Sequence, residues 1–301
     1  MAARPAPAAT PRRGRAVVGI SGYDYKGWAG VFYPAGLPKA RWLAHASRTF
    51  DSVELNGTFY SLKSPAVFAR WASEVPPRGF EFAIKGGRFI THNLKLRRAE
   101  SALGNFFASG ILALGTLTGP FLWQLPATYG FDAERVASFL ARLPRNSAEG
   151  EAVASWHDER LRRGALTESA ARVTYRHAME VRHPSYFHEE FYAVLREYRV
   201  GLVLADTAGK FPYAEELTSD LVYIRLHGST QLYTSGYSDA ELDWWAARIQ
   251  GWRATGRDVY TYFDNDAKVH APFDALRLRE RLDAHDAHDA GDGRHTRGRA
   301  R

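Results

Sequence analysis

The sequence predicts a single α/β domain built as a closed (β/α)8 barrel, or TIM barrel. Eight short strand-like runs are mostly separated by helical segments, which favours parallel strands joined by right-handed crossovers. The stretch 16–284 is close in length to the about 250 residues typical of such a barrel. Nearly every run ends in a polar residue, as expected where strand ends form an active site. An open doubly wound sheet is the alternative, but the chain lacks its glycine-rich phosphate-binding motif.

Apolar runs with a charged or polar residue near the C-terminal end mark the strands. In the fifth run, Ala178, Glu180 and Arg182 share one face, and Pro184 ends the strand because proline offers no N–H to a ladder. The predicted strands cover residues 16–20, 51–56, 80–85, 119–125, 176–183, 201–206, 221–227 and 258–263.

Helices are predicted between these strands, several of them with recognisable first turns. Pro65 fits the first turn of one helix, Asp132 caps another, and Ser238 with Glu241 has the spacing of a capping box. The predicted helices cover residues 38–48, 65–74, 100–114, 132–142, 186–198 and 238–253, and a last one starts near residue 272. Only the connection between the sixth and seventh strands lacks an obvious helix.

Three segments fall outside the barrel pattern. Residues 1–15, rich in Arg, Pro and Ala, lack the apolar core of a secretory signal and are predicted to be a disordered tail. Residues 144–172 are predicted to be a partly helical insertion between the fourth and fifth strands. Residues 285–301, rich in His, Asp and Arg, are predicted to be a second disordered tail, so the barrel domain spans 16–284.

Composition narrows the class of protein and its partners. The 301 residues are 45% hydrophobic and 24% charged, the profile of a soluble globular protein, and no apolar run approaches the about 20 residues of a membrane span. The absence of cysteine excludes disulfides and thiolate sites and fits a reducing compartment, so a cytoplasmic location is expected. Of the net charge of +7, residues 1–15 carry +4 and residues 277–301 carry +2. Weak, nonspecific nucleic-acid contact is therefore expected only through the tails.

Polar residues at the strand ends predict the position of a site. The C-terminal ends of barrel strands gather on one face, so their side chains should converge there. These strand-end residues are Ser21, Glu54, Asn56, Lys85, Gln124, Glu180, Arg182, Asp206, Arg225, His227 and the group at 264–266. The opposite strand ends contribute few such groups.

Seven motifs occur in order between residues 16 and 280. They are GISGYDY (19–25) with Trp28, ELNGTFY (54–60), KGGRFITH (85–92), QLP (124–126), EVRHPS (180–185), YIRLHG (223–228) and FDND (263–266). Together they resemble the motifs of the YecE-like domain-of-unknown-function family. The resemblance implies a TIM barrel with a polar pocket at the strand C-termini, and it brings no known reaction. The sequence departs from the family pattern at Gly57, where Ser is usual, at Asp264, where Asn is usual, and in the longer 144–172 insertion.

The candidate residues divide by chemistry into two groups. Glu54, Glu180 and His227 are the predicted catalytic residues, because carboxylates and an imidazole suit acid/base work. The predicted substrate-binding residues are Tyr23, Asn56, Tyr60, Lys85, His92, Gln124, Arg182, His183, Asp206, Arg225, Asn265 and Asp266. The cations in this set suit a small anionic or polyhydroxylated ligand, and the aromatic rings suit the walls of its pocket.

Several interpretations of this group are possible. We favour an enzyme that uses acid/base chemistry on a small anionic or sugar-like metabolite, by hydrolysis, isomerisation or lyase cleavage. The alternatives are a nucleic-acid-binding or nucleic-acid-processing barrel and a non-catalytic ligand-binding protein. In a purely structural interpretation, Glu180 and Arg182 only bridge to Lys85 or Arg225. No cofactor is predicted, and a divalent metal is disfavoured because three cations share the site.

Overall fold

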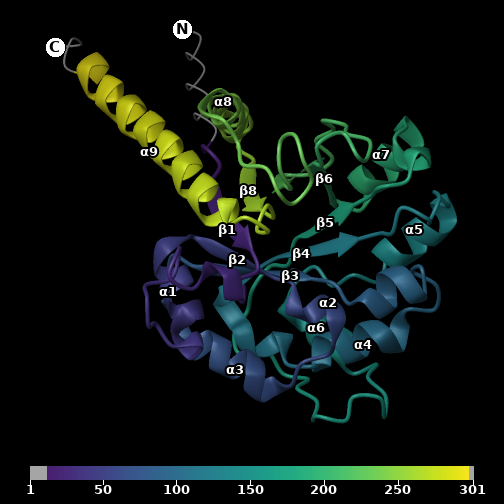
Figure 1. Ribbon diagram of the computed structural model, residues 1–301. Helices are drawn as coiled ribbons and strands as arrows, with labels where there is room; N and C mark the ends of the chain where they lie inside the picture. Colours follow the sequence, from purple (N-terminus) through teal and green to yellow (C-terminus); the bar gives the residue numbers. More distant parts are fainter. Residues whose placement is uncertain (1–11, 298–301) are drawn as a thin grey trace, which may run out of the picture.

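Eight parallel strands form a closed barrel in the computed structural model, which describes residues 12–297 (Figure 1). The strands are β1 (Ala16–Ser21), β2 (Ser52–Leu55), β3 (Glu81–Lys85), β4 (Thr118–Gln124), β5 (His177–Glu180), β6 (Gly201–Asp206), β7 (Leu221–Leu226) and β8 (Asp258–Phe263). They follow one another around the barrel in sequence order, and β8 pairs in parallel with β1 to close it. The predicted TIM barrel is confirmed.

Helices surround the barrel, with the strands at the centre of the view in Figure 1. The α-helices are α1 (Trp42–Thr49), α2 (Gly57–Tyr60), α3 (Pro65–Glu74), α4 (Glu100–Ala108), α5 (Ala133–Leu140), α6 (Ser147–Ala154), α7 (Glu189–Glu197), α8 (Asp239–Ala254) and α9 (His270–Arg297). The predicted helix over 100–114 is divided, because Gly110 adopts a φ of 121° and a separate helical segment, Ile111–Leu117, follows. The capping box of α8 forms as predicted between Ser238 and Glu241. Among the described residues, no helix is both long and apolar enough to cross a membrane.

Alternation along the strands determines which side chains fill the barrel. The side chains that point into the barrel form one buried cluster. Its members are Val17, Ala83, Leu122, Ala178, Val203, Leu221, Tyr223, Tyr260 and Tyr262. The intervening residues point outward and pack in the larger core beneath the helices. Because side chains alternate, the next inward position toward each C-terminal end belongs to the mouth of the barrel. Glu54, Glu180 and Arg225 are three of these positions.

The outer layer has a gap between β6 and β7. Residues 207–220 contain no helix in the structure, as the sequence predicts, and α8 lies on the far side of the gap. Thr207 and Thr218 tie this loop to the barrel: the Thr207 hydroxyl accepts the N–H of Phe211, and the Thr218 hydroxyl bonds to the backbone of Val200 and Leu202. The loop is therefore held by side-chain to backbone hydrogen bonds.

The structure describes part of each predicted tail, residues 12–15 and 285–297. Residues 1–11 and 298–301 lie outside the described residues, whereas residues 12–15 contact the barrel. Arg15 pairs with Glu81 and Asp258. Gly14 lies against the backbone of Arg257. A Cβ atom at position 14 would be 1.7 Å from the carbonyl oxygen of Arg257. Residues 12–15, predicted to belong to a disordered tail, therefore pack against the barrel domain in the structure.

The C-terminal helix is longer than predicted. The sequence predicts a disordered tail from residue 285, but α9 continues to Arg297. Asp286 accepts two hydrogen bonds of 2.9 Å from Arg253 of α8, so the side chain is anchored beyond the predicted end. The sequence signal was misleading because this anchor comes from a residue 33 positions away.

The insertion 144–172 packs against the outside of the barrel. Its helix, α6, is followed by irregular chain in which Asp158 bonds to Asn105 of α4. Farther along, the N–H of Leu166 and of Ala170 donates to the backbone of the 100–117 region. The partly helical insertion is thus integrated with α4.

Candidate functional site at the barrel mouth

Arg225 is the centre of a buried ion cluster at the mouth. It lies on the inward face of β7 and is fully buried. Its guanidinium donates to both oxygens of Glu54, at 2.8 and 3.1 Å. It also donates at 2.8 Å to Glu180 and at 2.9 Å to Asp264. One cation from β7 therefore joins a carboxylate within β2, the carboxylate that ends β5 and the carboxylate that follows β8.

Further donors hold the Glu54 carboxylate. The Tyr223 hydroxyl donates to Oε2 at 2.5 Å, and the Ser21 hydroxyl donates to Oε1. Burial, followed by the Glu54 charge, raises the pKa of Tyr223 well above its ordinary value, so the phenol keeps its proton. Each oxygen of Glu54 is thus occupied by two donors from the protein. Glu54 is consequently fixed in orientation.

Glu180 is bound by two arginines. Arg182 Nε donates to Oε1 at 2.8 Å, and Arg225 donates to Oε2. Burial alone would raise the pKa of Glu180, but the two arginines outweigh it and hold that pKa well below its usual range. Glu180 therefore carries its negative charge throughout the neutral range. The contact that the sequence predicts between Glu180 and a mouth cation is present.

His227 lies beside the same cluster, two residues after Arg225. Arg225 approaches its Nε2 at 3.3 Å, and Nδ1 lies 2.9 Å from Asp264 Oδ2. A guanidinium can only donate, so Nε2 is the acceptor side of the ring and Nδ1 is the side that faces Asp264. The ring of Tyr233 covers the imidazole edge-on at 5.4 Å, and His227 is completely buried.

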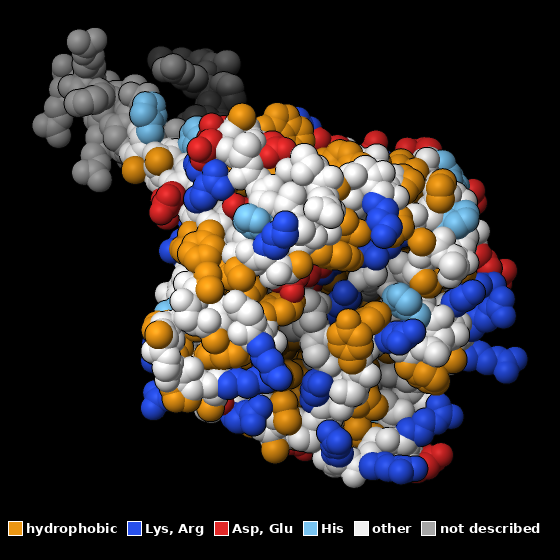
Figure 2. Space-filling view, in the orientation of Figure 1, with side chains coloured by type: hydrophobic (Ala, Val, Ile, Leu, Met, Phe, Trp, Pro, Cys, Tyr) orange, Lys and Arg blue, Asp and Glu red, His pale blue; other side chains and the backbone are white. Residues whose placement is uncertain are grey.

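A cavity of about 610 Å³ opens beside this cluster. It is lined by Gly22, Tyr23, Asp24, Tyr25, Glu54, Leu55, Asn56, Gly57, Tyr60, Lys63, Trp71, Lys85, Tyr233, Asp264 and Asp266. Helix α2 carries two of these residues and lies near the centre of Figure 1. The space-filling view in the same orientation is hollowed there, with acidic and basic side chains both visible inside (Figure 2).

Lys85 is the unusual cation of this cavity. Its Nζ lies 4.8 Å from the centre of the Phe59 ring, and among the described residues no carboxylate lies within ion-pair distance of it. Burial and the nearby Arg225 lower the pKa of Lys85 to about 8, against the opposing charges of Glu54, Glu180 and Asp264. A lysine with this pKa exchanges its proton close to neutral pH.

Two polar groups on the cavity wall complement Lys85. Asn56 donates to the Ser21 hydroxyl at 2.9 Å, while its buried Oδ1 has no hydrogen-bond partner among the described residues. Burial and the neighbouring Asp264 raise the pKa of Asp266 to about 6. The cavity therefore contains an unused acceptor and a carboxyl group that titrates near neutrality.

The other predicted residues differ in how they relate to the cavity. Tyr23 and Tyr60 line it, and Tyr60 is on the rim, 75% exposed. Gln124 ends β4 in register with Glu180. His92 packs edge-on against Phe59 at 5.1 Å, and burial together with Arg88 and Lys85 lowers the pKa of His92 to about 4.

Three predicted residues point elsewhere. His183 bonds to Ser185 at 2.7 Å, in the turn after β5. Asp206 accepts the Tyr237 hydroxyl and lines a different cavity, outside the barrel. Asn265 donates to Asp274 of α9 at 2.9 Å and is fully buried. The structure does not bring these three side chains to the mouth cavity.

Asp264, Tyr25 and Lys63 also line the mouth cavity, although none of them is among the predicted catalytic or substrate-binding residues. Asp264 appears in the sequence analysis only within the strand-end group at 264–266. A usable signal existed for Asp264: Tyr260 and Tyr262 point inward, so the same alternation carries position 264 inward and position 265 outward. Tyr25 and Lys63 belong to loops without such periodicity.

No grouping of three or more His, Cys, Asp or Glu suited to a metal ion occurs among residues 12–297 that the structure describes. The carboxylates at the mouth are instead bound by arginines. Nη2 of Arg225, for example, lies 2.8 Å from Oε1 of Glu54.

Fold and site together define a TIM-barrel protein with a buried ion cluster and a polar cavity at the C-terminal ends of its strands. Residues 17–296 match the family described as "Protein of unknown function DUF72". The chain belongs to this family, as its seven motifs suggest.

Two kinds of relatives agree with this assignment. The UPF0759 protein YecE of Escherichia coli K12 is 30% identical over 145 residues, which are 48% of this chain and 43% of that protein. The match thus spans less than half the length of that relative. A crystal structure of a DUF72 family protein from Thermotoga maritima MSB8 is similar with a TM-score of 0.70 and 25% identity, covering 89% of this chain and 99% of that one. One from Enterococcus faecalis V583 has a TM-score of 0.67 and 17% identity, covering 89% and 95%.

Proposed function

We propose that this protein is an enzyme that binds a small anionic, polyhydroxylated metabolite in the mouth cavity and acts on it by acid/base chemistry. The observation that carries the proposal is Lys85, a half-buried amine that faces the cavity without a carboxylate in ion-pair distance among the described residues. An ammonium that is partly removed from water and has no partner is costly, and an anionic group of a ligand would provide the missing partner.

The cavity wall supports the polyhydroxylated part of this ligand. The unpartnered Oδ1 of Asn56 would accept a hydrogen bond from a hydroxyl group. Tyr23 and Tyr60 offer aromatic faces on which the apolar face of a sugar-like ring packs. Lys63, at the rim, adds a second positive charge for the anionic group.

Two groups of the cavity are suited to proton transfer near neutral pH. The pKa of Asp266 is about 6 and that of Lys85 about 8, so one is mainly deprotonated and the other mainly protonated at pH 7. Proton transfer is common to hydrolysis, isomerisation and lyase cleavage, the three predicted reaction types. Of the predicted catalytic residues, Glu54 reaches the cavity, and we assign Glu180 and His227 positioning roles behind it.

The first test replaces Lys85 by Met. Binding of a panel of sugar phosphates and sugar acids is measured by calorimetry, and ligands that copurify are identified by mass spectrometry. We expect Lys85→Met to weaken the best ligand at least about tenfold, because a charge-assisted hydrogen bond is lost. Its melting temperature should not fall, since the change removes a half-buried charge beside Arg225. Lys26→Met, on an exposed turn, is the matched control. Unchanged affinity in Lys85→Met would contradict the proposal, and turnover of the bound compound separates an enzyme from a binding protein.

The pH dependence of binding provides a second prediction. Because the pKa of Lys85 is about 8, the amine is charged below that pH and neutral above it. Affinity for the anionic ligand should therefore fall as the pH rises from about 6 to about 10, with its midpoint set by Lys85. In Lys85→Arg the cation persists over this range, so the fall should disappear. An identical fall in both proteins would assign the titration to another group.

A further inference from the structure

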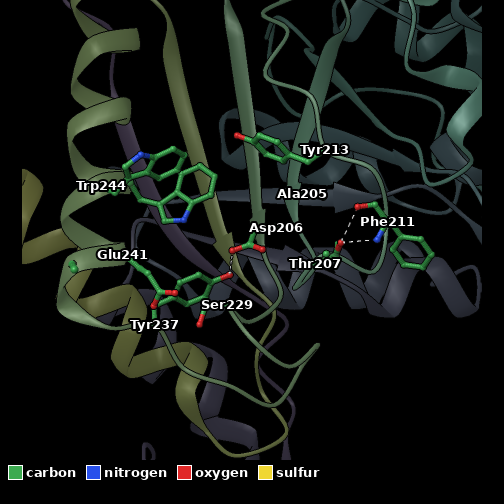
Figure 3. A pocket seen from close by; sticks show the side chains of 12 residues that line it. Ala205, Asp206, Thr207, Phe211, Tyr213, Ser229, Tyr237, Glu241 and Trp244 are labelled. Carbon is green, nitrogen blue, oxygen red and sulfur yellow. Dashed lines mark hydrogen bonds between the residues drawn. The ribbon is translucent and has the colours of Figure 1, made fainter.

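A second cavity, of about 490 Å³, occupies the gap in the helical layer between β6 and β7 (Figure 3). Its walls come from the end of β6, the helix-free loop 207–220, the loop after β7 and the first half of α8. We call it the outer cavity. The proposal for the mouth does not involve it.

The outer cavity has a negative charge without a counter-ion. Its lining includes the carboxylates of Asp206 and Glu241 and no lysine or arginine. Asp206 accepts hydrogen bonds from the Tyr237 hydroxyl at 3.0 Å and from the N–H of Ala208 at 3.2 Å. Among the described residues, no lysine or arginine lies within ion-pair distance of it. Burial raises the pKa of Asp206, as expected for a carboxylate that lacks a cationic partner.

Aromatic rings surround this carboxylate. Trp244 is 48% exposed and packs edge-on against Trp245 at 4.8 Å, and Tyr213 is 45% exposed. Figure 3 shows Trp244 on α8 and Tyr213 on the loop at facing sides of the cavity, with Asp206 below both rings in this view. Large aromatic side chains exposed together in a concave site are typical of a binding surface.

One contact shows that the Trp244 ring accepts a cation. The guanidinium of Arg248 lies 4.8 Å from the centre of that ring. Arg248 also forms an ion pair with Glu215 of the loop, which neutralises its charge and fastens the loop to α8. The two walls of the outer cavity are therefore linked, while Asp206 keeps its uncompensated charge.

We propose that the outer cavity binds a small organic cation, a quaternary ammonium or protonated amine, held by the charge of Asp206 and the faces of Trp244 and Tyr213. Aromatic faces attract cations through their quadrupole, and the attraction strengthens where water is partly excluded. A neutral ligand of the same shape would leave the Asp206 charge uncompensated. The charge of the lining thus selects a cation over a sugar or an anion.

The test compares two probes of nearly equal shape and different charge. Choline carries the quaternary ammonium, and 3,3-dimethyl-1-butanol replaces its nitrogen by carbon. Binding to the full chain is measured at about pH 8 by calorimetry and by tryptophan fluorescence. We expect choline to bind at least about tenfold more tightly than the alcohol. Asp206→Asn, which keeps the shape, and Trp244→Ala should each weaken choline about tenfold.

Two matched controls locate the cation. Trp156→Ala removes a 39% exposed tryptophan of the insertion and should leave choline binding unchanged. Asp266→Asn removes a carboxylate of the mouth cavity and should also leave it unchanged. Equal affinity for the two probes, absence of choline binding, or a loss in Asp266→Asn but not in Asp206→Asn would each overturn the proposal.

Discussion

Replacing Arg225 by Met should lower the free energy of unfolding by about 3–5 kcal/mol, the range for a buried ion pair broken on one side. Arg225 is the shared partner of Glu54, Glu180 and Asp264, and all of its bonds to them are 3.1 Å or shorter. Methionine fills much of the volume but leaves these carboxylates short of positive charge. Urea unfolding at about pH 8 measures the loss.

The matched control is Arg70→Met. Arg70 is 63% exposed at its side chain and pairs with Glu74 at 3.5 Å, so its removal should change stability by no more than about 0.5 kcal/mol. In Arg225→Met, the crowded carboxylates should take up protons more readily than in the unfolded chain. The difference in unfolding free energy between the wild type and Arg225→Met should therefore become smaller as the pH falls from about 8 to about 5. A loss below about 1 kcal/mol that is independent of pH would show that the cluster is not structural.

Glu180→Gln should lower the free energy of unfolding by about 3 kcal/mol. The change removes the negative charge that compensates Arg182 and one of the negative charges that compensate Arg225. The native pKa of Glu180 lies well below its unfolded value of 4.5. Its contribution to stability is thus complete above pH 4.5 and is lost as the pH falls toward the native pKa. The variant should accordingly lose less stability than the wild type on acidification.

Ligand binding by Glu180→Gln distinguishes the structural interpretation from the catalytic one. Melting temperatures from about pH 3 to about pH 8 are measured together with the affinity for the ligand of the Lys85 experiment. We expect low stability with affinity retained, since Glu180 is 1% exposed and lies behind the cavity. Normal stability with lost turnover would instead restore Glu180 as a catalytic residue. Glu74→Gln, which alters a surface pair, is the control.

The sequence predicts most of the barrel because its strands obey a simple period. Alternation places Glu54, Glu180 and Arg225 on inward faces, and the closed parallel topology then brings them together. The same rule, applied to every strand, would have selected Asp264 in place of Asn265 and excluded Asp206. Asp206 ends its strand, but Val203 and Ala205 take the inward positions of β6, so the side chain of Asp206 points outward.

The remaining features depend on contacts that no local pattern contains. Arg253 anchors Asp286 and extends the predicted end of α9, and Arg257 approaches the backbone of Gly14. The low pKa of Lys85 results from burial and from Arg225 on another strand. Each of these requires distances between residues far apart in the chain.

The ion cluster also bears on how long the folded state lasts. Arg225 is 171 residues from Glu54, 45 from Glu180 and 39 from Asp264. Contacts of such separation, on strands from both ends of the chain, form only when the ring of strands is nearly complete. Interactions absent from the transition state for folding change the unfolding rate and leave the folding rate almost untouched. The charged mouth should therefore slow spontaneous opening of the finished barrel, which gives the protein kinetic stability.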